Sequence, residues 1–158
     1  MRKVVANTTP LIALAGIGRL ELLHLLYGEI YIPSAVLSEI ESEPAKTQVT
    51  MADWIKVIEV HGVASRSLFS ARLHIGEIEV ILLAQEQMAD LVLMDDNAAK
   101  KTAKFLGLSV AGTLGVLIRA KKEGLIREVK PIMEDLIADG LYVDNKIRKM
   151  VLKASSEE

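Results

Sequence analysis

The sequence predicts an α/β protein built on a parallel sheet with helices on both faces. Short apolar runs rich in Val, Ile and Leu alternate along the chain with longer stretches of helical periodicity, which is the pattern of strand–helix–strand architectures. The 158 residues suffice for one domain, and they are 51% apolar but only 4% aromatic. We therefore expect one core made mainly of aliphatic side chains.

The first part of the chain alternates three predicted strands with helices. Thr8 and Pro10 favour a helix start, because a hydroxyl can cap the first amides and proline fits the first turn. Pro33 and Ser34 favour another start. The predicted strands are 4–6, 29–32 and 55–60, and the predicted helices are 8–18, 20–26, 34–40 and a short one ending at Trp54.

The second part continues the alternation after an irregular segment, 61–70. Beyond Gly112 the pattern is helical, with breaks at Gly124, Pro131 and Gly140. We expect one domain over 1–153 and a frayed tail over 154–158. The remaining predicted strands are 91–94 and 108–110, and the remaining predicted helices before Gly112 are 75–88 and 97–106.

Charge and composition exclude several classes of protein. Nineteen basic and 21 acidic residues give a net charge of −2, and Cys is absent. A surface that is basic throughout is thereby excluded, as are disulfides, thiol nucleophiles and cysteine-based zinc sites. The uncharged stretch 4–18 contains Asn7, Thr8 and Thr9 and is shorter than the roughly 20 residues of a spanning helix. We expect a soluble, cytoplasmic protein with no membrane partner.

Polar side chains follow the first and fourth predicted strands. Asn7 comes after the first, and Asp95 and Asp96 come after the fourth. Ligands of a parallel sheet collect beyond the carboxyl ends of its strands, and carboxylates there suit a hard divalent cation. An aspartate before a helix is also an ordinary N-cap. Both interpretations can hold, with one aspartate in each role.

Three glutamates can be placed by helical spacing. Glu77 shares a helix face with Ile81 and Ala84, so it either reaches the rim of the crevice or is a first-turn acid favoured by the helix dipole. Glu79 is expected in solvent. Glu39 lies on the flank of an apolar stripe and, from spacing alone, is an ordinary surface glutamate.

Taken together, the segments 4–14, 32–40, 76–84 and 91–96 resemble the PIN domain (PilT N-terminus-like) in order and spacing. Segment 112–126 is similar to a prokaryotic, VapC-toxin-like subfamily, and the resemblance covers roughly residues 3–152. It implies a three-layer α/β/α sandwich with a parallel sheet in the strand order 3-2-1-4-5.

The resemblance also implies a function. Family members are mostly Mg²⁺- or Mn²⁺-dependent ribonucleases, and many are toxins held by an antitoxin protein, so RNA, an antitoxin and a second copy of the chain are the expected partners. The family's site positions are shared by several elements. They fall on Asn7, Glu39, Glu77 and Asp95 as metal ligands, with Asp96 as an accessory ligand, and Glu39, Glu77 and Asp95 are the expected catalytic residues. Independently of the family, the hydroxyls of Thr8 and Thr113 could position phosphate or metal-bound water, although capping is the more ordinary role for Thr8.

Asn7 departs from the aspartate that PIN nucleases usually carry. Its carbonyl oxygen can bind Mg²⁺, but it brings no charge and cannot act as a base, so we expect a weaker cation site. The alternative is a catalytically weakened or inactive PIN-fold module that binds RNA or protein. A phosphoacceptor receiver domain shares the alternating pattern, but it requires paired acids where this chain has Asn7. Basic side chains that could contact RNA phosphates, or simply form a solvated helix face, are Lys100, Lys101 and Lys104.

Overall fold

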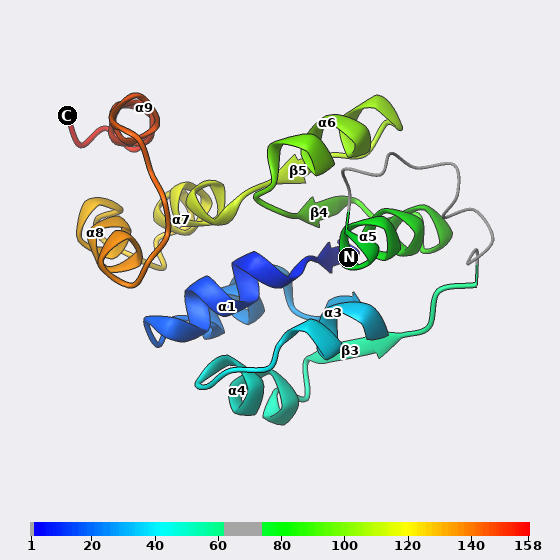
Figure 1. Cartoon of the computed structure of the whole chain (residues 1–158). Coiled ribbons are helices and arrows are strands. Elements are labelled where there is room, and N and C mark those ends of the chain that lie inside the picture. Colours follow the sequence, from blue (N-terminus) through cyan, green and yellow to red (C-terminus); the bar gives the residue numbers. More distant parts are fainter. Residues whose placement is uncertain (1, 62–73) are drawn as a thin grey trace.

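Five parallel strands form the sheet at the centre of the molecule (Figure 1). The computed structural model describes residues 2–61 and 74–158. The strand order β3-β2-β1-β4-β5 confirms the order implied by the PIN resemblance. The strands are β1 (Val4–Ala6), β2 (Ile30–Pro33), β3 (Ile55–Ile58), β4 (Leu91–Leu93) and β5 (Val110–Ala111).

The central strand, β1, determines which polar residues become neighbours. It pairs with β2 on one side and with β4 on the other, where Ala6 is the partner of Leu93. The ladder extends one residue further, because the N–H of Asn7 donates to the carbonyl of Leu93 at 2.8 Å. The residues that follow β1 and β4 therefore leave the sheet side by side at its carboxyl edge.

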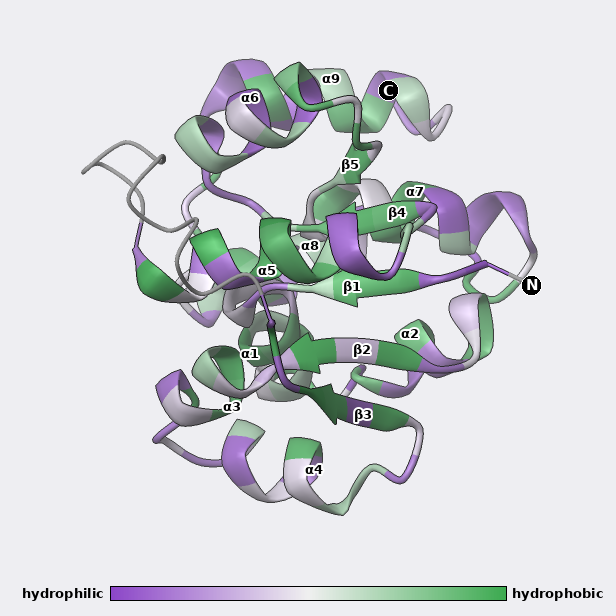
Figure 2. Cartoon of the chain, turned by 90° about the vertical axis from the view of Figure 1, so that its right-hand side faces the viewer, coloured by the Kyte–Doolittle hydropathy of each residue, from purple (hydrophilic) through white to green (hydrophobic). Residues whose placement is uncertain are grey.

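Helices cover both faces of the sheet. Helix α5 packs on β1, β2 and β4, and helix α1 lies on the opposite side of the sheet, where it packs against α7 and α8 (Figures 1 and 2). The helices are α1 (Thr8–Gly16), α2 (Glu21–Tyr27), α3 (Ser34–Glu39), α4 (Ala45–Met51), α5 (Ile75–Glu86), α6 (Asn97–Phe105), α7 (Thr113–Lys122), α8 (Lys130–Ala138) and α9 (Asn145–Ala154).

The core is aliphatic, as the composition predicts, and α5 runs through it. Leu11 and Leu14 of α1 are fully buried on one face of the sheet, and Ile81 and Leu83 of α5 are fully buried on the other. The expectation that Glu79 lies in solvent is wrong, since it is only 5% exposed. One side of helix α5 packs on the sheet, and α3 and α6 also pack against this helix. The side of α5 that turns away from the sheet is therefore partly covered as well.

The end of the chain is held in place, contrary to the expectation that 154–158 frays. Ser155 is buried, and the Glu157 carboxylate accepts the backbone N–H groups of Val129 (2.7 Å) and Lys130 (2.9 Å) at the start of α8. Lys121 Nζ donates to the same carboxylate at 3.0 Å. Helix α8 has no side-chain cap of its own, so Glu157 supplies it from a distant part of the sequence.

These donors also explain the acidity of Glu157. Partial burial raises the pKa of its carboxyl, but the two backbone N–H groups and Lys121 outweigh burial and lower the pKa from 4.5 to about 2. The tail is thus fixed by an ionised side chain at neutral pH.

Most element boundaries fall within a few residues of those predicted. The fifth strand is displaced, from the predicted 108–110 to Val110–Ala111, and Pro131 lies in the first turn of α8 instead of breaking a helix. Residues 62–70 of the irregular segment lie outside the described residues. No helix in the described part of the chain combines the length and apolarity needed to cross a membrane.

Candidate functional site

The candidate site begins with Asn7, which is placed by β1 and the first turn of α1. Asn7 is only 5% exposed. Its side-chain Oδ1 accepts the N–H of Thr8 at 2.8 Å, so the amide caps α1. The residue type that departs from the family pattern therefore has a structural role that an amide oxygen performs without a charge.

Asp95 is held by two hydrogen bonds from one residue. Its Oδ1 accepts the N–H of Thr113 at 2.8 Å, and its Oδ2 accepts the Thr113 hydroxyl at 2.6 Å. Thr113 is fully buried at the start of α7. The pair fixes the orientation of the carboxylate at the end of β4, because both of its oxygens are restrained.

Gly112 provides the space for this arrangement. A Cβ at Gly112 would stand 2.7 Å from Asp95 Oδ1 and 2.9 Å from Lys100 Nζ, so no side chain fits there without displacing one of them. Lys100, which is half-buried, therefore reaches the surroundings of Asp95 from α6, while Lys101 and Lys104 are exposed on the same helix. The contacts of these lysines with RNA phosphates remain a prediction.

Asp96, and not Asp95, is the residue that caps the helix after β4. Its Oδ2 accepts the N–H of Ala99 at 2.9 Å and caps α6. The side chain is exposed, and its other carboxylate oxygen is not used by the cap.

Glu39 connects the starts of two helices. It is the last residue of α3, and its Oε2 accepts the hydroxyl of Thr8 at 2.7 Å. Its Oε1 occupies the space that a Cβ on Gly76 would fill in the first turn of α5. The apparently ordinary surface glutamate thus lies against the residue that precedes Glu77.

Glu77 is the buried acid of the group, with 8% of its surface exposed. Its Oε1 accepts the N–H of His74 at 3.0 Å and completes the first turn of α5. Burial raises the pKa of Glu77, and the negative charges of Asp96 and Glu39 raise it further, against the lowering effect of His74. Three carboxylates from separate elements therefore share one negative potential.

The structure brings the predicted residues to one edge of the sheet but does not arrange them around a common point. Among residues 2–61 and 74–158, no three His, Asp or Glu side chains are placed to hold a metal ion. Instead, the acids accept N–H or hydroxyl donors of the chain. The donor set of carboxylate and amide oxygens suits Mg²⁺ or Mn²⁺ in its chemistry. Burial is the main cause of the raised pKa of Glu77, and a cation would relieve the smaller contribution that comes from the charges of Asp96 and Glu39.

Sequence reasoning missed two glycines that make the site possible. Because Gly76 has no side chain, Glu39 can approach its backbone. In the same way, Gly112 leaves space for Asp95 and Lys100. The available signal was their position, since each directly precedes a site residue, Glu77 or Thr113, at a helix start. A glycine there permits close approach of a side chain from another element.

Comparison with known proteins identifies the family of the chain. A family model described as a PIN domain matches residues 3–157, almost the whole chain. No curated protein matches the sequence. A PIN domain is a nuclease-type fold that generally depends on divalent metal ions. The fold, the strand order and the family match agree, and the chain belongs to the PIN-domain family.

Proposed function

We propose that the chain is a Mg²⁺- or Mn²⁺-dependent endoribonuclease that hydrolyses RNA phosphodiesters. The observation that carries this proposal is the placement of acids from several elements at the carboxyl edge of the sheet. The negative charges of Glu39, which ends α3, and of Asp96, which precedes α6, act on Glu77 in the first turn of α5, and Asp95 follows β4. Such gathering is costly for a purely structural group, because like charges raise one another's free energy. Carboxylates from several elements at one edge of a sheet are the groups that a metal-dependent phosphoryl transfer would use.

Each residue has a distinct part in this proposal. Asp95, restrained by Thr113, is the fixed ligand, and Glu39 and Glu77 complete the negative set with Asp96 beside them. The cation, when bound, supplies positive charge that stabilises the additional negative charge of an in-line displacement at phosphorus. Asn7 would contribute a neutral oxygen from β1.

RNA would be held by contacts to its phosphates. Lys100 and Asp95 both lie next to Gly112, and the exposed Lys101 and Lys104 follow Lys100 along α6. Phosphate contacts of this kind position a nucleic acid without reading its sequence.

A second candidate function is a PIN-fold module that binds RNA or protein with little or no catalysis. It is favoured by Asn7, whose oxygen already accepts the N–H of Thr8 and whose amide adds no negative charge. The finer form of the first proposal, a toxin paired with an antitoxin and acting as a homodimer in the cytoplasm, rests on the family resemblance.

Calorimetric titration with Mn²⁺ tests the cation site. We expect weak binding by the wild-type chain, binding about tenfold tighter by Asn7→Asp, and loss of binding in Asp95→Asn. Asn7→Asp restores a charge without changing the size of the side chain, so it is the matched variant. Absence of heat for the wild type, with clear binding by Asn7→Asp, contradicts a retained site.

A cleavage assay tests the enzyme itself. Mixed RNA is incubated with Mg²⁺ or Mn²⁺ and with the wild type, Asn7→Asp or Asp95→Asn. Cleavage that depends on Asp95 supports the nuclease. Equal cleavage by Asp95→Asn identifies a contaminant, and Mn²⁺ binding without cleavage by either of the other two proteins favours the binding module.

A further inference from the structure

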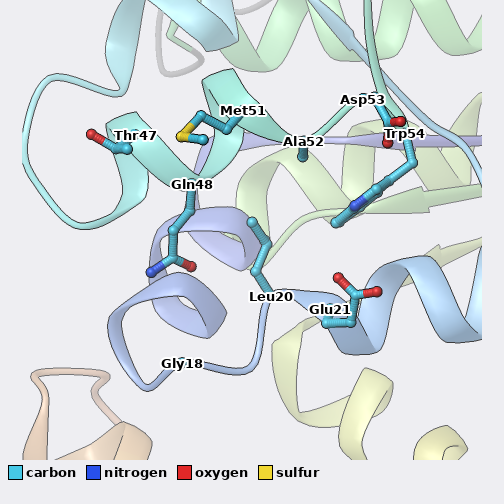
Figure 3. A pocket seen from close by; sticks show the side chains of 9 residues that line it. All are labelled: Gly18, Leu20, Glu21, Thr47, Gln48, Met51, Ala52, Asp53 and Trp54. Atoms are coloured by element: carbon cyan, nitrogen blue, oxygen red, sulfur yellow. The ribbon is translucent and has the colours of Figure 1, made fainter.

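A cleft of about 400 Å³ (Figure 3) is lined by residues that directly precede β3. It therefore lies at the amino edge of the sheet, whereas the acidic site lies at the carboxyl edge. Its walls come from the start of α2, from α4 and from the turn that leads into β3. Leu20 and the exposed Met51 supply apolar surface, and Trp54 forms one side. None of these residues belongs to the candidate active site.

Trp54 brings an indole N–H to this cleft. The residue is 9% exposed, and one face of its indole stacks on the ring of His24, with 5.1 Å between ring centroids and 20° between planes. Figure 3 shows the indole reaching into the cleft between Leu20 and Glu21. Its Nε1–H forms no hydrogen bond with any residue that the structure describes. An indole N–H favours an oxygen acceptor, and a ligand in the cleft would offer one.

The charge of the cleft is negative. Among the described residues that line it, the charged ones are Glu21 and Asp53, and neither side chain makes an ion pair or hydrogen bond within the described part of the chain. The neighbouring cation, Arg19, lines a different cleft together with Arg127. Two acidic residues therefore line this cleft, and neither carboxylate has a positive partner among residues 2–61 and 74–158.

We propose that the cleft binds an arginine residue of a peptide. The guanidinium would meet the carboxylates of Glu21 and Asp53, and the aliphatic stem would pack on Leu20 and Met51. The carbonyl of the same residue would accept the Nε1–H of Trp54. A polyamine lacks that acceptor, and free arginine carries an additional carboxylate that the two acids repel.

Trp54 also provides the assay, because it is the only tryptophan in the chain. Its fluorescence is followed while the full chain is titrated with arginine capped by an N-acetyl and a C-methylamide group. We expect a saturable change with a Kd on the order of 1 mM or tighter, the range for a ligand of this size. Capped citrulline, which is neutral, agmatine, which lacks the carbonyl, and free arginine should each bind more weakly.

The combined variant Glu21→Gln with Asp53→Asn should weaken binding of capped arginine by roughly tenfold. Both side chains are exposed, so the substitutions leave the core intact. The control Glu41→Gln removes an exposed carboxylate from another cleft and should bind as the wild type does. Absence of a saturable change overturns the proposal, as does equal binding of capped citrulline, of free arginine or by the double variant. None of these readouts involves metal or RNA, so the outcome is independent of the nuclease proposal.

Discussion

Substitution of Thr113 by valine tests whether the hydroxyl that holds Asp95 matters for the candidate site. Valine has nearly the shape of threonine, and Thr113 is fully buried, so the methyl group enters the place of the hydroxyl without leaving a cavity. The hydrogen bond from the hydroxyl to Asp95 Oδ2, 2.6 Å long, is lost. The bond from the backbone N–H to Oδ1 is kept.

The expected loss of stability follows from these two changes. A hydrogen bond to an ionised group contributes about 1.5–3 kcal/mol, and the additional buried methyl group returns about 0.8 kcal/mol. The free energy of unfolding should therefore fall by about 1–2 kcal/mol. For a chain of this length that corresponds to a decrease in Tm of roughly 2–8 °C.

The same variant should weaken Mn²⁺ binding. Residues that orient a metal ligand typically change metal affinity by about 10–100-fold, and Asp95 loses one of its two restraints. The matched control is Thr113→Ser, which keeps the hydroxyl and loses a methyl group instead, at a cost of about 0.5–1.5 kcal/mol. The two variants should thus have similar stability and different Mn²⁺ affinity.

Urea denaturation and Mn²⁺ calorimetry on the wild type, Thr113→Val and Thr113→Ser separate the two effects. A stability change appears as a shift of the midpoint with an unchanged slope. Equal Mn²⁺ affinity of the two variants would refute the positioning role of the hydroxyl. Unchanged stability of Thr113→Val would refute the energetic reasoning.

Three further predictions concern acids and a glycine near the helix ends. Glu77→Gln keeps the acceptor for His74 but removes a carboxyl whose pKa is raised by burial and by neighbouring acids. Urea denaturation across pH should show its stability advantage over the wild type growing as pH rises above the ordinary glutamate pKa, while Mn²⁺ affinity falls about tenfold. Gly76→Ala places a methyl group where Glu39 Oε1 lies, so calorimetry should show weaker Mn²⁺ binding, and wild-type affinity would contradict the close approach. Glu157→Gln turns an amide N–H₂ toward N–H donors and should lower stability at neutral pH by about 2–3 kcal/mol. Because the folded pKa of Glu157 is about 2 against 4.5, the wild type should lose this contribution as pH falls from 4.5 toward 2, and the variant should lack that acid transition in a melting series.

The fold and the location of the candidate site could be predicted because both depend on local patterns. Apolar runs alternating with helical periodicity indicate a parallel sheet, and polar residues after the first and fourth runs indicate its carboxyl edge. The strand order, supplied by the family resemblance, then makes Asn7 and Asp95 neighbours. The pairing of Ala6 with Leu93 bears this out.

The contacts of the acids could not be predicted from spacing. Glu39 was indistinguishable from a surface glutamate, because its hydroxyl donor Thr8 and its neighbour Gly76 come from other elements. The helical spacing of Glu79 predicts exposure to solvent, whereas its burial depends on the elements that pack around α5. The residue pattern of one helix does not reveal which other elements pack on the side that turns away from the sheet.

The sequence by itself determined the class of fold, the edge of the sheet where acids gather and the missing charge at Asn7, since each is written in residue order and strand ends. Only the tertiary structure decided what those acids touch, that Glu157 caps α8, and that Trp54 lines a cleft together with Glu21 and Asp53. The physical reason is the separation along the sequence of the residues that interact. Periodicity and capping act within a few residues, but hydrogen bonds, burial and pKa shifts depend on groups that folding brings together from distant parts of the chain.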